Sequence, residues 1–392
     1  MNALMLPSNW QRVRLGDIGK PCMCKRVMKH QTTRYGEIPF YKIGTFGNTA
    51  DAFISKKLFL EYKTKYSFPK KGDILISASG TIGRAVIYDG KPAYFQDSNI
   101  VWIDNDETLV KNDFLFYAYS NVKWNTEHTT ILRLYNDNFR NTLIPLPPLN
   151  EQIAIANILS GLDHYLYSLD ALILKKESVK KALSFELLSQ RKRLKGFNQA
   201  WQKVRLGDIC EFGNGGAYET LIVENGDFKL ISLNSIDIDG NLKNTMKRVN
   251  FYDNSLKQDD IVMVLSDVAH GDFLGLCAVI PSNDYVLNQR MGRLRKRNDC
   301  INILFLRLYI NANQKYFKMQ GQGSSQLNLS KKAIEDFEIL LPPLNEQIAI
   351  ANILSALDHE IISLKNKKRQ FKNIKKALNH DLMSAKIRVL KK

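Results

Sequence analysis

The sequence has no long apolar run and few cysteines. No stretch approaches the roughly 18 apolar residues that a bilayer-spanning helix needs, so we expect no membrane partner. The first residues, MNALMLPSNW, show neither the charged nor the apolar region of a secretion signal, and we expect a cytoplasmic protein. The five cysteines match neither a disulfide framework nor a zinc site, which predicts reduced, mostly packed thiols.

Motifs of several enzyme classes are also missing. The glycine-rich SGTIGR at residues 79–84 has no lysine followed by serine or threonine, so it is not a phosphate-binding P-loop. Both Pro-Pro pairs are flanked by leucine, which excludes the Asn/Asp-Pro-Pro-aromatic motif that holds a flipped base. Glu61, Tyr62 and Lys63, with Asp51 upstream, imitate a nuclease site only loosely. We predict no catalytic residue, no cofactor and no metal site in this chain.

Positive charge is abundant. The chain has 56 Lys and Arg against 39 Asp and Glu, a formal net charge of +17, which favours a polyanionic partner. Residues 1–145 carry 20 basic and 13 acidic side chains, whereas residues 197–340 carry 17 of each. Residues 341–392 carry 11 basic and 4 acidic side chains, and this excess either follows nucleic acid or is a solvated helix face.

A long internal repeat organises the chain. LPPLNEQIAIANILSGLDH at residues 146–164 recurs at residues 341–359 with the single change of Gly161 to Ala356. WQRVRLGDI at residues 10–18 recurs as WQKVRLGDI at residues 201–209. The two offsets are 195 and 191 residues, so one unit is written twice.

The first part of each repeat alternates strand-like and turn-like segments. KGDILISAS from Lys71 and DDIVMVLS from Asp259 predict strands, whereas IGTFGNTAD, SGTIGR, GNGGAY and GQGSSQ predict loops. DFLFYAYSNV from Asp113 and LFLRLYINANQKYFKM from Leu304 predict helices. We therefore predict two mixed α+β domains.

The second part of each repeat predicts a long helix. Paired prolines precede it, Asn150 and Asn345 stand where an N-cap belongs, and a glutamate follows in the first turn. Apolar residues then recur at coiled-coil spacing, with seven of nine positions apolar in each copy. These seam positions are Leu159, Leu162, Leu166, Leu169, Ile173, Lys176, Lys180, Leu183 and Leu187, then Leu354, Leu357, Ile361, Leu364, Lys368, Phe371, Lys375, Leu378 and Leu382.

A helix of about 40 residues is roughly 60 Å long and cannot fold back onto its own small domain. The other copy is the obvious partner. If a pseudo-twofold relates the copies, the two helices run antiparallel. Two dissimilar domains on such a rod could read two different short DNA elements at a fixed separation of about 34 Å or a small multiple.

The doubled L-P-P-L-x-E-Q signature before a long helix, with W-x-x-V-x-L-G-D-I opening each variable domain, resembles the specificity subunits of type I restriction-modification systems. The resemblance covers nearly the whole chain. It implies target recognition domains at residues 1–145 and 197–340, and helical spacers at residues 146–196 and 341–392. Each domain would read one half of an asymmetric, two-part double-stranded DNA site, without catalysis by this chain.

The resemblance also implies partners. Two methyltransferase subunits would dock on the helical spacers, and restriction subunits would join the full complex. S-adenosylmethionine, ATP and Mg would be bound by those partner subunits. The apolar stripes of the two IAIANIL segments are predicted to pack against these methyltransferase subunits or against the other helix rather than against DNA. Their residues are Ile153, Ile155, Ile158, Ile348, Ile350 and Ile353.

Base reading needs Arg, Lys, Asn or Gln on loops that reach the major groove. The candidates are Thr45, Asn48, Ser79, Thr81, Arg84 and Asn136 in the first domain, and Asn214, Tyr218, His270, Gln322, Ser325 and Gln326 in the second. A basic cluster either contacts phosphates or forms a charged strand edge. It consists of Arg290, Arg293, Arg295, Lys296 and Arg297.

Two other functions stay open from the sequence. An enzyme that modifies DNA alone would consume S-adenosylmethionine without a partner. A coiled-coil scaffold with protein-binding domains would not bind random duplex DNA at low salt with a steep loss as salt rises.

Overall fold

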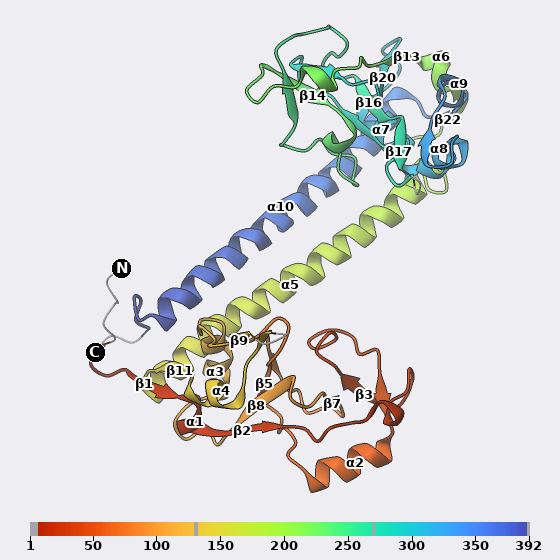
Figure 1. The fold of residues 1–392 in the computed structure, drawn as a ribbon. Coiled ribbons are helices and arrows are strands. Elements are labelled where there is room, and N and C mark those ends of the chain that lie inside the picture. The colour runs from red at the N-terminus through yellow and green to blue at the C-terminus, as the bar shows by residue number, and fades with distance from the viewer. Residues whose placement is uncertain (1–6, 129–131, 269–270, 390–392) are drawn as a thin grey trace. The chain divides into compact units, whose positions relative to one another are not determined.

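The computed structural model describes residues 7–128, 132–268 and 271–389. It divides into two compact units, residues Met1–Asp170 with Asn366–Lys392 (unit 1) and residues Ala171–Lys365 (unit 2). Each unit holds one globular domain, which we call domain 1 and domain 2, together with part of both long helices (Figure 1). The units therefore cut across the four consecutive segments expected from the sequence.

The two repeated motifs of each unit pair with each other. β1 (Gln11–Arg14) runs antiparallel to β11 (Leu143–Leu146), and β12 (Gln202–Arg205) runs antiparallel to β22 (Glu338–Leu341). The first strand of each domain thus pairs with its last strand, immediately before the long helix begins. This pairing is a physical reason for the two motifs to be kept together in both copies.

Both domains are built on one four-stranded and one three-stranded sheet. In domain 1 the orders are β2 (Gly19–Met23), β8 (Ile100–Asn105), β5 (Ile74–Ser77), β6 (Ala85–Ile87), and β4 (Phe53–Ile54), β3 (Ile38–Tyr41), β7 (Tyr94–Phe95). In domain 2 they are β13 (Cys210–Asn214), β20 (Met291–Lys296), β16 (Ile261–Val264), β18 (Cys277–Val279), and β15 (Lys247–Val249), β14 (Phe228–Ile231), β19 (Tyr285–Leu287). The matching topology confirms two α+β domains of one kind.

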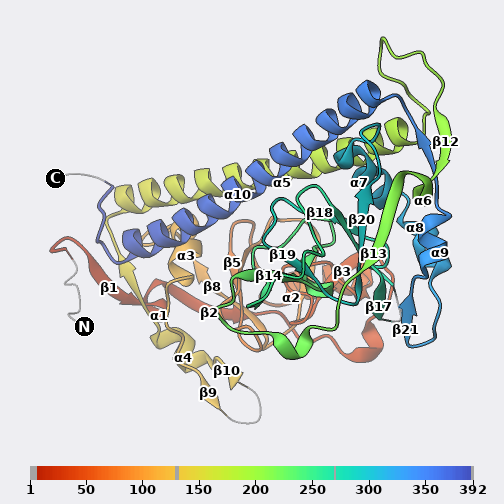
Figure 2. The same cartoon turned by 90° about the horizontal axis from the view of Figure 1, so that it is seen from above.

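Short helices and hairpins complete the domains. Domain 1 has α1 (Leu15–Ile18), α2 (Lys56–Lys65), α3 (Asn112–Tyr119) and α4 (Asn136–Asn141), which lies beside the hairpin of β9 (Glu127–His128) and β10 (Leu132–Arg133) (Figure 2). Domain 2 has α6 (Leu206–Ile209), α7 (Ile303–Ala312), α8 (Gln314–Gln320), α9 (Lys331–Glu335) and the paired strands β17 (Ser266–Val268) and β21 (Gln326–Asn328). Single 3₁₀ turns lie at Lys29–Gln31, Glu219–Leu221 and Leu233–Ser235. The helix expected from Leu304 is two helices, interrupted at Asn313.

The long helices are α5 (Leu149–Leu188) and α10 (Leu344–Met383), each of 40 residues. In α5 the carbonyl of Pro148 accepts the first backbone hydrogen bonds, from Glu151 and Gln152. The prediction that Asn150 and Asn345 are N-caps is wrong by two residues, because each helix begins directly after its prolines. Asn150 lies in the first turn, where its side chain accepts a hydrogen bond from the Glu151 amide.

The seam prediction is confirmed within each unit, because all eighteen seam positions are buried or half-buried. The four lysines of the seam reach acidic residues on the other helix. The pairs are Lys375 with Asp163 and Lys368 with Asp170 in unit 1, and Lys180 with Asp358 and Lys176 with Glu360 in unit 2. In both units, residues later in one helix pair with residues earlier in the other, so the packed segments are antiparallel.

The glutamate of the LPPLNEQ motif is buried at the start of each helix. The Trp10 indole donates to Glu151 at 3.0 Å, and Arg388, beyond the end of α10, donates to the same carboxylate at 2.7 and 2.9 Å. In unit 2 the Trp201 indole and Arg193, beyond the end of α5, donate to Glu346 in the same way. One carboxylate therefore holds the first strand of a domain, its following helix and the end of the other helix.

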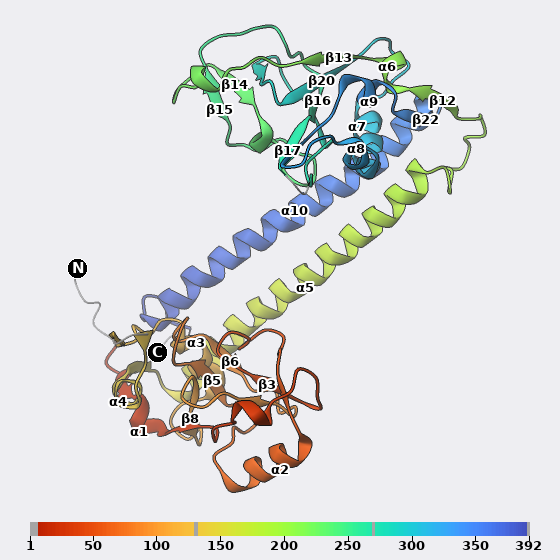
Figure 3. The same ribbon diagram turned by 45° about the vertical axis from the view of Figure 1, so that its right-hand side comes forward.

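The glutamine of the motif attaches the same helix start to the domain. Gln152 accepts from the Lys111 amide and donates to the carbonyls of Leu109 and Pro147. In unit 2, Gln347 makes the equivalent bonds to Asn302, Cys300 and Pro342. α7, which begins after Asn302, lies beside the start of α10 (Figure 3). The helix starts are thus built into the domain cores.

All five cysteines are free thiols, as expected. Burial raises the pKa of Cys24 and of Cys210 to about 12, so both thiols stay protonated near neutral pH. Within the described ranges, neither 40-residue helix, nor any shorter one, combines the length and apolar character needed to cross a bilayer.

We predict that Glu346→Gln lowers the free energy of unfolding by about 3 kcal/mol, because the substitution leaves the Arg193 guanidinium without its buried counter-ion. Urea unfolding measures this loss. Glu338→Gln is the matched control, since the Lys203–Glu338 pair is more than half exposed and its loss should cost under about 1 kcal/mol. Equal losses for the two variants would contradict the role assigned to Glu346.

Candidate nucleic-acid interface

Two of the predicted loops of domain 1 lie together in unit 1. Arg84 donates from its guanidinium to the carbonyl of Phe46 at 2.9 Å, which ties residues 79–84 to residues 43–48. A pocket of about 250 Å³ lies between the loops and is lined by Gly44, Gly80, Thr81 and other residues of both. Thr81 and Arg84 are exposed beside it. The structure therefore brings together three of the residues predicted to read bases, Thr81, Arg84 and the exposed Asn48.

The remaining candidates of domain 1 differ in accessibility. The Thr45 hydroxyl accepts from the Lys42 amide and is committed to its own turn. Ser79 is only 5% exposed, and its hydroxyl donates to Asn99 at 2.7 Å, so it positions Asn99 rather than reaching outward. Asn136 is exposed at the first position of α4.

Sequence reasoning missed a basic pocket beside these loops. It has a volume of about 430 Å³, and Arg26, Lys29, Lys42 and Arg133 line it together with the amide side chain of Asn99. Arg26 pairs with Asp97 at 2.8 Å, and Lys42 pairs with an exposed aspartate. The signal was present in the sequence, because residues 24–34, CKRVMKHQTTR, are strongly basic. These basic side chains place positive charge, which attracts phosphate, around the loops of domain 1.

In domain 2, Asn214 is exposed at the end of β13. Tyr218 follows in the next loop, where its hydroxyl donates to Asp253 at 2.9 Å and its ring lies 4.7 Å from that of Phe251. The hydrogen bond to Asp253 raises the pKa of Tyr218. Tyr218 is therefore a neutral, fixed side chain, whereas Asn214 is free to reach a ligand.

The loop before β21 carries three further candidates. Gln322 and Ser325 are exposed and Gln326 is half-buried at the start of β21. A bridge between Gln322 and Asn328 closes this loop, and β21 pairs with β17. The candidate His270 lies outside the described residues.

The basic cluster of domain 2 is not a charged strand edge, because β20 lies between β13 and β16 in the sheet. Arg293 pairs with Glu211 at 2.7 Å, and Arg295 forms a bidentate pair with the buried Asp260 at 2.6 and 2.8 Å. Lys296 pairs with Asp299, and Arg297 donates to two backbone carbonyls.

The side chain of Arg290 has no ion-pair partner among the residues that the structure describes, and it is exposed in the turn before β20. Arg293 and Arg295 hold the sheet together. Arg290 is consequently the member of the cluster best placed to meet a phosphate.

The predicted docking stripe is divided by the fold. Ile153, Ile158, Ile348 and Ile353 are between 37% and 46% exposed on the helices. Ile155 and Ile350 are each 1% exposed because they enter the cores of domain 1 and domain 2. These two residues fasten helix to domain and are not available to a partner.

No three His, Cys, Asp or Glu side chains gather as a potential metal site in the part of the chain that the structure describes. Glu61, suggested by the nuclease-like triplet, pairs with Lys65 along α2, and Asp51 pairs with Lys42.

The chain matches known proteins over most of its length. The family model of the type I restriction modification DNA specificity domain matches residues 7–176 and, a second time, residues 198–372. A Haemophilus influenzae protein with a provisional name as a type I restriction enzyme specificity subunit is 64% identical over 148 residues, which are 38% of each chain. The specificity subunit of the type I restriction enzyme MjaVIII of Methanocaldococcus jannaschii is 28% identical, over 99% of this chain and 95% of its own.

A solved structure shows the same fold. The crystal structure of the S subunit of a type I restriction-modification system from M. genitalium has a TM-score of 0.65 and 19% sequence identity, over 97% of this chain and 98% of that one. Because the family model matches the chain twice, once for each repeat, this protein belongs to the family of type I restriction-modification DNA specificity subunits.

Proposed function

We propose that this chain is the non-catalytic DNA-reading subunit of a cytoplasmic type I restriction-modification complex. Domain 1 and domain 2 each read one half of an asymmetric, two-part double-stranded DNA site. The observation that carries the proposal is one sheet topology present twice with unlike loops. A shared framework presents each domain in the same way, while different loop residues select different bases.

The reading chemistry follows from the exposed loop residues. Arginine bonds the two acceptors of guanine in the major groove, and asparagine bonds adenine. Arg84, Asn48 and Thr81 supply such groups in domain 1, and Asn214 and Gln322 supply them in domain 2. The basic pocket of domain 1 and Arg290 of domain 2 contribute phosphate contacts, which position the protein without selecting sequence.

The long helices have two functions in this proposal. They set the spacing between the half-sites, and they dock two methyltransferase subunits. Ile153 with Ile158, and Ile348 with Ile353, form two equivalent exposed apolar stripes, which supports two copies of one partner. Restriction subunits would join the assembly. The partner subunits would supply S-adenosylmethionine, ATP and Mg.

Exchange of domain 2 tests the proposed division of labour. Residues 197–340 are replaced by the second domain of another specificity subunit, the chimera is co-expressed with its cognate methyltransferase, and methylated adenines are mapped across a genome. One half of the methylated motif should change while the other half and the spacing stay. A change in both halves would refute independent reading.

A single substitution tests the loops. Arg84→Ala should relax the preference for one base in the half-site of domain 1, at a cost of about 1–3 kcal/mol in discrimination. The same methylation map measures it. Arg14→Ala is the control, because Arg14 is an exposed arginine of unit 1 that pairs with Asp17. If both variants methylate the unchanged motif with unchanged fidelity, Arg84 does not read a base.

Charged substitutions test the docking stripes. Each single variant, Ile153→Asp or Ile348→Asp, should bind one methyltransferase subunit, because the new aspartate would bury a charge in an apolar contact. The double variant should bind no methyltransferase subunit. Sedimentation analysis gives the mass of each complex. Tyr35→Asp, at a residue 87% exposed in domain 1, should retain two copies. Two copies on the double variant would place the docking surface elsewhere.

A further inference from the structure

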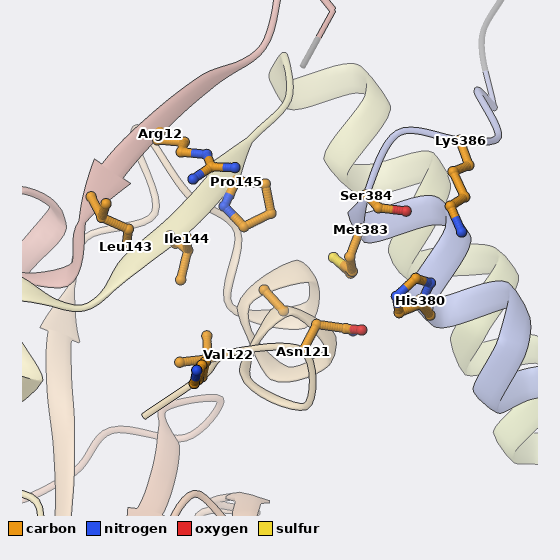
Figure 4. A pocket seen from close by; sticks show the side chains of 12 residues that line it. Arg12, Asn121, Val122, Leu143, Ile144, Pro145, His380, Met383, Ser384 and Lys386 are labelled. Carbon is orange, nitrogen blue, oxygen red and sulfur yellow. The ribbon is translucent and has the colours of Figure 1, made fainter. Parts of the chain in front are cut away.

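Unit 1 contains a pocket that the proposed DNA reading does not use. It has a volume of about 440 Å³ and lies between the β1–β11 pair, the end of α3 and the end of α10 (Figure 4). Apolar side chains, among them Val122, Ile144, Pro145 and Met383, line it. Met383 and Ser384 of the α10 end lie across the pocket from Pro145 and Arg12 (Figure 4).

Cationic side chains surround this apolar floor. Arg12, Lys123 and Lys386 line the pocket together with His380. Within the described residues, neither Arg12 nor Lys123 has an ion-pair partner. Among the described residues, Asp381 is the carboxylate that pairs with this group, 3.6 Å from Lys386 and 3.3 Å from His380. The pocket therefore keeps an excess of positive charge.

The pocket exists because two residues differ between the units. α3 and α7 begin 191 residues apart, the offset of the WQ motifs, so Ala118 is equivalent to Tyr309. In unit 2 the Tyr309 ring is buried, and its hydroxyl accepts from the Leu340 amide at 3.1 Å. In unit 1 the residue equivalent to Leu340 is Pro145, which has no amide hydrogen to satisfy. An alanine and a proline thus leave open in unit 1 the space that a tyrosine fills in unit 2.

The charged residues at the rim of the pocket also differ between the two units. Lys203, the equivalent of Arg12, pairs with Glu338 at 2.6 Å. In unit 1 the residue equivalent to Glu338 is Leu143, so Arg12 lacks that carboxylate. The residue equivalent to His380 is Phe185, an uncharged side chain whose ring centroid lies 4.5 Å from the Arg191 guanidinium. Unit 2 therefore pairs with a carboxylate the cation that unit 1 leaves without one.

We propose that this pocket of unit 1 binds an acidic segment of a partner protein, with a carboxylate side chain held by Arg12 and Lys123 and a neighbouring apolar side chain on the floor of the pocket. A phosphate of duplex DNA fits less well, because it lies on a solvated ridge and offers nothing apolar to bury. In unit 2 the Tyr309 ring takes the equivalent space and Lys203 is paired with Glu338, so the two otherwise similar units are distinguishable to a partner.

A binding experiment on the full chain tests the proposal. The probe is a fluorescein-labelled peptide of alternating glutamate and leucine, and fluorescence anisotropy measures its affinity. Arg12→Ala and Lys123→Ala should each weaken binding about tenfold, because each removes a charged hydrogen-bond donor from a partly desolvated site. Ala118→Tyr should abolish binding by filling the pocket as Tyr309 fills its equivalent. Lys203→Ala, the matched change in unit 2, should leave the affinity unchanged.

A random-sequence duplex is the second probe. Its affinity should be the same for wild type and Ala118→Tyr. The proposal is overturned if the wild type does not bind the peptide, if Arg12→Ala and Lys203→Ala weaken it equally, or if Ala118→Tyr weakens the duplex instead. Thermal melting shows whether Ala118→Tyr is folded. If it is not, the Arg12→Ala and Lys123→Ala results decide. The methylated motif does not enter this test, so its outcome is independent of the proposed DNA reading.

Discussion

The structure depends on a buried carboxylate at the start of each long helix. Glu151 and Glu346 are the points where the first strand of a domain, the helix that follows the domain and the end of the other helix meet. A buried charge is tolerated only when it is paired and hydrogen-bonded. Each glutamate therefore needs both its tryptophan indole and its arginine guanidinium in place. The constraint makes unit 1 a composite of segments from both ends of the chain, whereas unit 2 is continuous in sequence.

The seam between the helices uses weaker interactions for a different purpose. Half-exposed ion pairs contribute little stability, but four lysines that each meet an acidic residue on the opposite helix favour one register over others. Asp163 with Lys375 and Asp358 with Lys180 occupy equivalent positions, whereas the Lys176–Glu360 pair of unit 2 is replaced in unit 1 by Tyr165 and Phe371, whose rings contact each other at a tilt. The duplicated helices therefore keep a common register with different chemistry.

The two units share a framework but differ in their loops and pockets. The sheet topology, the motif pairing and the helix starts are the same in both units. The loops differ, and so do the basic pocket of domain 1 and the pocket between the β1–β11 pair and the end of α10. Framework positions tolerate little change because each contacts several elements at once. Loop positions are free to change, which allows one fold to carry two specificities.

The sequence by itself determined the duplication, the α+β domains, the long helices with their seam, and the family, because repeated motifs and apolar periodicity are local or directly comparable features of the chain. It could not separate Ile155 from Ile153, or the structural Arg293 and Arg295 from the exposed Arg290. Only the tertiary structure decided these roles, because a side chain's burial and charge partners, such as Asp260 or Glu211, come from residues distant in sequence. The pocket of unit 1 arose in the same way, from the spatial meeting of Ala118 with Pro145.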